Sequence, residues 1–93
     1  MTNDTLMTQQ ASQIEEIVRA HVGSATPIPL EASLADDLGI DSLELVELSL
    51  SLEKLFGVEF PSEDIRASNT LDDIIQVVFR TTQKYSQEKV KLA

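Results

Sequence analysis

The chain has 93 residues, a formal net charge of −9 and no cysteine, which predicts one small domain without disulfides or a cysteine-based metal site. Its first residues lack the basic and apolar segments of a signal peptide, and no stretch approaches the roughly 20 apolar residues of a membrane span, so we expect a cytoplasmic protein. The acidic charge argues against binding to nucleic acid or to an anionic membrane and favours protein partners with basic surfaces.

The first predicted helix begins at about Thr5 or Thr8 and ends at Val22, with Gly23 as its stop. His21 lies in its last turn, where a positive partial charge suits the helix dipole, and we interpret it as a helix residue rather than a metal ligand or a catalytic group. Apolar side chains recur along the helix at the spacing of a core-facing stripe, namely Met7, Ala11, Ile14, Ile17, Val18 and Val22.

A long connection over residues 23–41 follows, with a possible short helical turn near Ala32–Ala35. A loop of this length is uncommon inside a compact domain unless its own side chains hold it in place. We expect five apolar residues to dock it onto the helices, namely Ile28, Leu30, Leu34, Leu38 and Ile40.

The second predicted helix runs from about Ser42 to Phe56, with Gly57 as its stop, and carries two apolar stripes. The stripe expected to face the core comprises Leu45, Leu48, Leu52, Leu55 and Phe56. The opposite stripe comprises Leu43, Val46 and Leu50, accompanied by Glu47, Glu53 and Lys54. It is either buried by another part of the chain or a docking surface, and docking is the favoured interpretation. Ser49 and Ser51 flank the inner stripe, and either face solvent or leave room for an apolar guest.

A brief third helix is predicted after Pro61, with Ser62 as its cap, lasting to about Arg66. The fourth opens at Thr70, which pairs with Asp73 in a capping-box pattern, and ends near Tyr85 or a few residues later. Its core-facing residues are Leu71, Ile74, Ile75, Val78 and Phe79.

The predicted fold is therefore all-α: a small four-helix bundle with three longer helices, one short helix and a long first loop. We expect a single domain over residues 1–93, with an ordered core of about 8–85 and frayed ends that include residues 86–93.

The segment Gly39–Leu43 places the Ser42 hydroxyl on the first turn of the second helix, after Asp41 as N-cap and with Glu44 as its capping-box partner. A helix N-terminus favours anions, so a phosphodiester on Ser42 would lie in a suitable field. The chain has one histidine, no cysteine and no Gly-x-Ser-x-Gly motif, so nothing is predicted to activate the hydroxyl as a nucleophile. We interpret Ser42 as a site of modification.

The twelve acidic and two basic residues between positions 31 and 73 suggest two other classes of protein. A calcium-binding loop fails on register: starting it at Asp36 places Asp41 where the invariant glycine belongs, and placing Gly39 there puts Leu34 in the first ligand position. No metal site is predicted. An acidic interaction module, in which Ser42 is an ordinary residue of the helix start, stays open on the cap pattern alone.

The run from Leu34 to Leu48, LADDLGIDSLELVEL, continued by Leu52-Glu53 and by the segment from Phe56 to Pro61, resembles the acyl carrier proteins of the phosphopantetheine-binding carrier family. The resemblance covers about residues 8–85 and implies that a phosphopantetheinyl transferase, using coenzyme A and magnesium, attaches 4′-phosphopantetheine to Ser42. The thiol of this arm would then carry acyl groups as thioesters between enzymes of fatty-acid or polyketide biosynthesis, on a monomeric carrier that catalyses nothing itself.

The resemblance also implies that partners recognise the helix that follows Ser42. The residues that match the recognition positions are Asp41, next to the attachment point, and Leu43, Glu44, Val46, Glu47, Leu50 and Glu53. In the family, the space between the helices can shelter the acyl chain. Two residues depart from the family pattern: Lys54 stands where many fatty-acid carriers have an acid, and Leu45 is more apolar than usual. A peptidyl or aminoacyl carrier remains an alternative.

Overall fold

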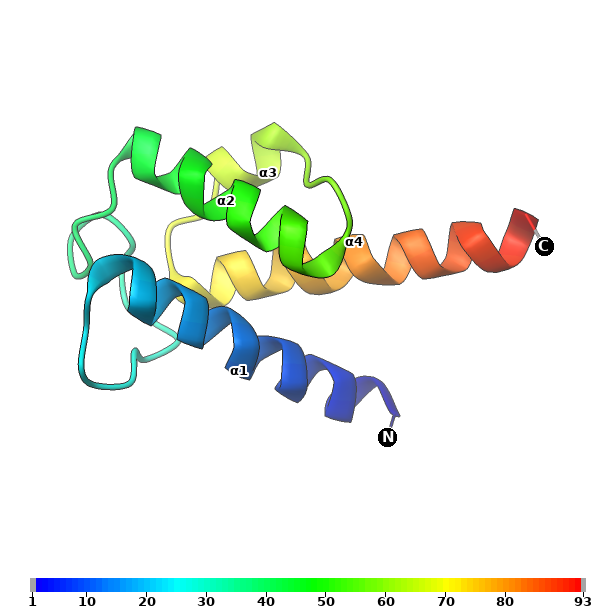
Figure 1. Ribbon diagram of the computed structural model, residues 1–93, viewed down its shortest axis with the longest axis horizontal. Coiled ribbons are helices and arrows are strands. Elements are labelled where there is room, and N and C mark those ends of the chain that lie inside the picture. Colours follow the sequence, from blue (N-terminus) through cyan, green and yellow to red (C-terminus); the bar gives the residue numbers. More distant parts are fainter. Residues whose placement is uncertain (1, 93) are drawn as a thin grey trace.

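The computed structural model describes the backbone of residues 2–92 and the side chains of residues 5–85. Within this part the chain forms α1 (Thr2–Val22), α2 (Ser42–Phe56), α3 (Ser62–Arg66) and α4 (Leu71–Leu92), with no β-structure beyond one isolated bridge. α1 runs opposite to α2 and α4, and the short α3 lies beside α2 (Figure 1). The all-α bundle of three longer helices and one short helix is confirmed. No helix among the described residues is long and apolar enough to cross a membrane.

The bounds of α2 and the end of α3 match the sequence prediction, whereas the two outer helices are longer than predicted. α1 already begins at Thr2, and α4 continues past Tyr85 to Leu92. Both extensions lack glycine and proline, so no residue in them interrupts a helix. The expected fraying falls largely on side chains outside the described ones and stays a prediction.

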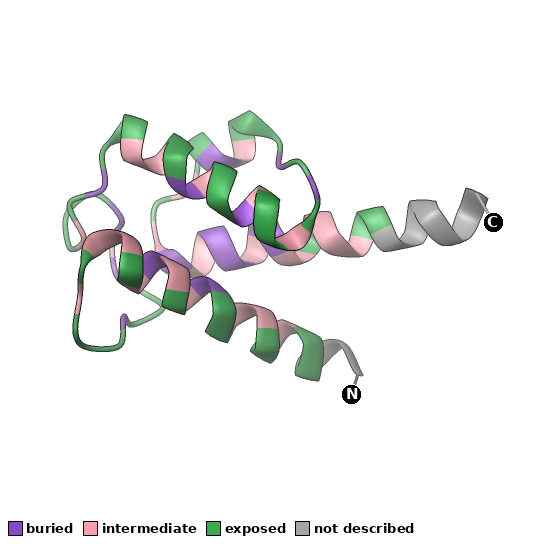
Figure 2. Ribbon diagram, in the orientation of Figure 1, coloured by how far each residue is buried: buried purple, intermediate pink, exposed green. Residues whose placement is uncertain are grey.

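An apolar core joins the inner faces of all four helices (Figure 2). Its fully buried side chains are Ile14, Val18, Leu48, Leu52, Leu71, Ile74, Ile75 and Val78, all of which the helical spacing predicts. Val77 is also buried, although the sequence reasoning missed it, and Phe79 is only half-buried.

The prediction that Leu55 faces the core is wrong, since its side chain is 49 % exposed. Leu55 shares a helix face with Leu48 but lies two turns further along α2. At that end of the helix, the described part of the chain does not cover it. An apolar residue on the inner face is buried only where another element lies opposite.

The long first loop is attached to the start of α4 by backbone hydrogen bonds. Leu71 N–H donates to Ala32 O at 3.1 Å, Asp72 N–H donates to Leu30 O at 2.9 Å, and Leu34 N–H donates to Asn69 O at 2.9 Å. The loop carbonyls thus accept from two N–H groups that a helix leaves without partners at its first turn. The Leu30 side chain is exposed, contrary to prediction, because its backbone rather than its side chain makes the contact.

Glu15 holds the same loop to α1. One of its carboxylate oxygens accepts a hydrogen bond from Ile28 N–H at 3.0 Å, while Arg19 donates to both oxygens at 3.0 and 2.9 Å. The hydrogen bond from Arg19, and then the Ile28 N–H, lower the pKa of Glu15. The buried Ile28 side chain adds an apolar contact. The loop is therefore attached to α1 through Glu15 and to the start of α4 through its backbone.

The caps of the last two helices differ from each other. Thr70 Oγ1 accepts from Asp73 N–H at 3.2 Å, and Asp73 accepts from Asn69 N–H and Thr70 N–H at 2.8 and 3.1 Å, which confirms the predicted pair. These hydrogen bonds, led by the one from Asn69, lower the pKa of Asp73. At α3 the predicted cap is wrong: Pro61 is the N-cap and Ser62 is the first helical residue, without a side-chain cap bond.

Candidate functional site

The chain approaches Ser42 through a tight turn in the first loop. Asp37 N–H donates to Ser33 O and Gly39 N–H to Ala35 O, both within a run of turns that replaces the possible short helix near residues 32–35. Gly39 has a φ of 69°, in the left-handed region that glycine adopts without strain. The next side chain, Ile40, is buried, and its N–H donates to Leu34 O at 2.8 Å. The segment before the serine is therefore fixed to the core.

A complete capping box opens α2. Asp41 is the N-cap, in extended conformation, and its carboxylate accepts from Glu44 N–H at 2.8 Å. The Glu44 carboxylate accepts in return from Asp41 N–H at 3.2 Å. Both carboxylates are therefore used to order the backbone around the serine, as the sequence pattern predicts.

Ser42 is the first residue of α2, and its side chain is exposed. Its hydroxyl makes no hydrogen bond with the described residues. Because the helix begins here, no preceding turn of helix supplies carbonyl groups to accept hydrogen bonds from the N–H groups of Ser42 and Leu43. The hydroxyl is thus accessible, and the positive end of the helix dipole lies beside it.

Among the described residues, no potential base forms a hydrogen bond with this hydroxyl. The carboxylates nearest in sequence, those of Asp41 and Glu44, accept hydrogen bonds from backbone N–H groups, and His21 lies in the last turn of α1. Among the described residues, no group of three or more histidine, aspartate or glutamate side chains could hold a metal ion. The exposed hydroxyl can be presented to another protein, and no described side chain is hydrogen-bonded to it as a base.

The outer stripe of α2 is exposed along its length. Leu43, Val46 and Leu50 are 68, 48 and 55 % exposed, and Glu47 and Lys54 are exposed beside them. No described part of the chain therefore buries the stripe, and its use as a docking surface stays a prediction. A continuous exposed apolar stripe is typical of an interaction surface.

Glu53 differs from Glu47, the other acidic residue of this stripe. It is half-buried, and its carboxylate accepts a hydrogen bond from Phe60 N–H at 2.8 Å. The neighbouring Glu59 N–H donates to the Tyr85 hydroxyl at 3.2 Å. Two side chains from different helices therefore hold the loop between α2 and α3. Neither contact carries a signal in the sequence, because both depend on the path of this loop.

The two serines beside the inner stripe have different surroundings. Ser51 is exposed, whereas Ser49 is half-buried and its hydroxyl donates to Val46 O at 2.8 Å. The Ser49 hydroxyl is thus satisfied by its own helix.

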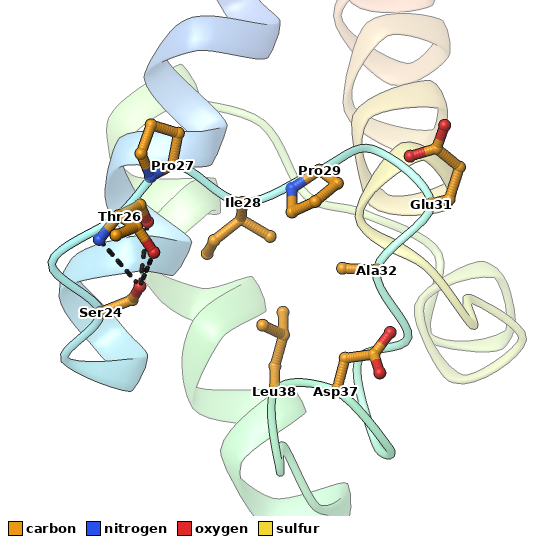
Figure 3. Close-up of a pocket in the computed structure, with 9 residues that line it drawn as sticks. All are labelled: Ser24, Thr26, Pro27, Ile28, Pro29, Glu31, Ala32, Asp37 and Leu38. Atoms are coloured by element: carbon orange, nitrogen blue, oxygen red, sulfur yellow. Dashed lines mark hydrogen bonds between the residues drawn. The ribbon is translucent and has the colours of Figure 1, made fainter.

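An open hollow of about 430 Å³ lies within the first loop (Figure 3). Its lining combines apolar side chains, among them Ile28, Pro29, Ala32 and Leu38, with the carboxylates of Glu31 and Asp37. The Ser24 hydroxyl donates to Thr26 O at 2.9 Å. Ser42 does not line this hollow, which therefore belongs to the loop and not to the surface around the serine.

Residues 12–78 match the family model described as a phosphopantetheine attachment site. The chain is 34 % identical over 73 residues to an acyl carrier protein of Clostridium acetobutylicum, a match that covers 77 % of this chain and 95 % of that protein. It is 33 % identical over 92 residues to the meromycolate extension acyl carrier protein of Mycolicibacterium smegmatis, covering 99 and 86 %.

Solved structures show the same fold. A candidate acyl carrier protein from Mycobacterium tuberculosis superposes with a TM-score of 0.71 at 28 % identity, covering 74 % of this chain and 93 % of that one. The crystal structure of an acyl carrier protein from Thermotoga maritima gives a TM-score of 0.73 at 20 % identity, covering 85 and 93 %, and is similar in fold.

Proposed function

Because the chain belongs to the phosphopantetheine-binding family of acyl carrier proteins, we propose that Ser42 is the residue to which its 4′-phosphopantetheine is attached. The family consists of non-catalytic carriers that hold this group covalently on a serine. The observation that carries the choice of Ser42 is its place as an exposed residue with a free hydroxyl at the start of α2.

Three other serines are less suited to this role because their hydroxyls already form hydrogen bonds. The hydroxyls of Ser49 and Ser68 donate to helix carbonyls at 2.8 and 2.9 Å, and that of Ser24 is bound to Thr26. The start of α2 also favours a phosphodiester electrostatically, because two unpaired N–H groups and the positive end of the helix dipole lie there. The capping box keeps the carboxylates of Asp41 and Glu44 on backbone N–H groups, which limits their freedom to swing toward that phosphate.

The bound arm supplies a thiol, which forms thioesters with acyl groups. Because the Ser42 hydroxyl has no hydrogen bond to a potential base among the described residues, we expect the transferase to take its proton. The role of this chain is then to hold the arm on a rigid helix start and to present α2 to each enzyme in turn.

Family membership implies a phosphopantetheinyl transferase and acyl-handling enzymes as partners. The proposal extends to where they bind: the exposed Leu43, Val46 and Leu50 anchor the enzyme and Glu47 attracts its basic groups. Asp41, Glu44 and Glu53 lie on the same helix and contribute negative potential, although their carboxylates already accept hydrogen bonds. We propose a monomer that acts in the cytoplasm in fatty-acid or polyketide-type synthesis, with peptidyl or aminoacyl loading as the alternative.

Intact-mass measurement tests the attachment residue. The protein is incubated with coenzyme A, magnesium and a broad-specificity phosphopantetheinyl transferase, and wild type is expected to gain one phosphopantetheine. Ser42→Ala should gain none, while Ser51→Ala, which removes an exposed serine from the same helix, should load as wild type does. Because Ser42 is exposed, its replacement should change the free energy of unfolding by no more than about 0.5 kcal/mol. Loading of Ser42→Ala would refute the assignment.

A further inference from the structure

Lys54 is an isolated cation on an acidic helix. It is the only basic residue of α2, and residues 31–73 contain one other, Arg66. Among residues 5–85, whose side chains the structure describes, no carboxylate forms an ion pair with it. The adjacent Glu53 projects from the helix in a different direction, as neighbouring helix residues do, and its carboxylate accepts from Phe60 N–H. The Lys54 charge is therefore available to a partner.

Exposed leucines precede and follow Lys54 along α2. Leu50, one turn earlier, is exposed, and so is Leu55, the next residue. An open hollow of about 500 Å³ is lined by Leu50, Ser51, Glu53 and Lys54. A cation in the last turn of a helix complements its dipole, but that does not explain why two leucines next to it remain uncovered.

Two opposite charges lie along the outer stripe, Glu47 between Val46 and Leu50 and Lys54 one turn beyond Leu50. Glu47 and Lys54 are separated by seven residues, about 10 Å along the helix, and Ser42 lies about 18 Å from Lys54. A uniformly basic enzyme surface would attract Glu47 and be repelled by Lys54. An enzyme turned end for end would meet like charges at both positions.

We propose that α2 binds an acyl-transfer enzyme in one orientation, in which a carboxylate of the enzyme faces Lys54, a basic residue faces Glu47, and an apolar side chain enters the hollow beside Leu50. This inference rests on the proposed attachment of the arm to Ser42. Lys54 is then a specificity-determining residue: it rejects enzymes that are basic along the whole helix and directs the end of the helix that carries the arm toward the active site.

The test uses an acyltransferase purified from the source cell by its ability to load the wild-type holo-carrier from malonyl-CoA or acetyl-CoA. We expect Lys54→Glu to lower kcat/KM at least about tenfold and Lys54→Ala about threefold, since reversal adds repulsion to the lost attraction. Lys84→Glu makes the same charge change on an exposed residue of α4 and should stay within about twofold of wild type. Replacing the facing carboxylate of the enzyme by lysine should restore the activity of Lys54→Glu.

Three results would overturn the inference, and a separate one would overturn the proposed function. Unchanged or faster loading of Lys54→Glu shows that no carboxylate faces Lys54. An equal loss in Lys84→Glu shows an effect of net charge only. A concentration-dependent dimer that Leu50→Ser dissociates makes a second copy of the chain the occupant of this surface. Failure of wild type to gain phosphopantetheine in the intact-mass assay refutes the proposed function. If every variant gains phosphopantetheine as wild type does, a change in acyl transfer reports on the orientation of the enzyme and not on attachment of the arm.

Discussion

Removal of the Glu53 carboxylate should destabilise the fold, although this residue lies on the helix proposed to bind partners. Its carboxylate accepts from Phe60 N–H at 2.8 Å, and the Phe60 side chain is part of the buried core. Glu53→Ala therefore leaves a partly buried N–H group without its acceptor. An unsatisfied buried donor costs about 1–3 kcal/mol. Because this site is only partly buried and water can reach it, we expect about 1 kcal/mol.

The size of this change is measurable in a domain of 93 residues. An unfolding entropy of about 2.1 cal/mol/K per residue converts 1 kcal/mol into a fall in Tm of about 5 °C. Urea unfolding followed by far-UV circular dichroism at pH 7 gives the free energy directly. Glu47→Ala is the matched control, because it makes the same substitution on the same helix at a side chain with no described hydrogen bond. It should change the free energy of unfolding by less than about 0.5 kcal/mol.

Glu53→Gln separates the hydrogen bond from the charge. Its amide oxygen can still accept from Phe60 N–H, so this variant should lose less stability than Glu53→Ala. If Glu53→Ala and Glu47→Ala unfold at the same urea concentration, the contact with Phe60 contributes nothing and the assignment of Glu53 to the α2–α3 loop is refuted.

Three further predictions concern the core, the surface and the response to acid. Leu52→Ala should lower the free energy of unfolding by about 2–5 kcal/mol in denaturant unfolding, because the Leu52 side chain is fully buried. Leu55→Ala should lower it by less than about 1 kcal/mol, and equal losses would contradict the burial described. Glu47→Lys should slow acyl loading in steady-state assays more at low salt than at high salt, since exposed charges are screened over about 8 Å at physiological ionic strength. An effect that does not change with salt would argue against electrostatic attraction between Glu47 and the enzyme. Folding lowers the pKa values of Glu15 and Asp73, so the stability they contribute is present above the ordinary carboxylate pKa of about 4 and is lost as pH falls through the lowered folded values. Asp73→Asn should therefore show a shallower loss of stability between pH 5 and 2 in acid titrations of circular dichroism, and a slope equal to that of wild type would contradict this.

The features that the sequence predicted well are those decided within a few residues. The pairs Asp41–Glu44 and Thr70–Asp73 each satisfy N–H groups of their own helix start, so the spacing alone identifies them. The position of Ser42 on the first turn follows from the same local pattern. Glycine after an amphipathic run likewise predicted the end of α2, where Gly57 adopts the left-handed conformation.

The features that it missed depend on which elements come together. Leu55 has the periodicity of a core residue, but no described side chain covers it, and Leu30 contributes its carbonyl to α4 rather than its side chain to the core. The hydrogen bonds between the loop and α4 join backbone atoms, which every residue type possesses, so no residue pattern could reveal them. The helix ends at Thr2 in α1 and Leu92 in α4 were also missed. There, the absence of glycine and proline was the only sign in the sequence that each helix extends further.

The acidic side chains along α2 do not all interact with partners in the same way, and this changes how charge on the helix should be understood. Asp41, Glu44 and Glu53 each accept a backbone hydrogen bond, whereas Glu47 makes none within the described residues. At distances of a Debye length all four attract a basic enzyme equally, because a carboxylate keeps its charge when it accepts a hydrogen bond. At contact only Glu47 can reorient to meet a cation without breaking a bond of the fold. Substitution of the other three would therefore alter stability together with binding, and Glu47 is the position at which attraction of partners can be measured by itself.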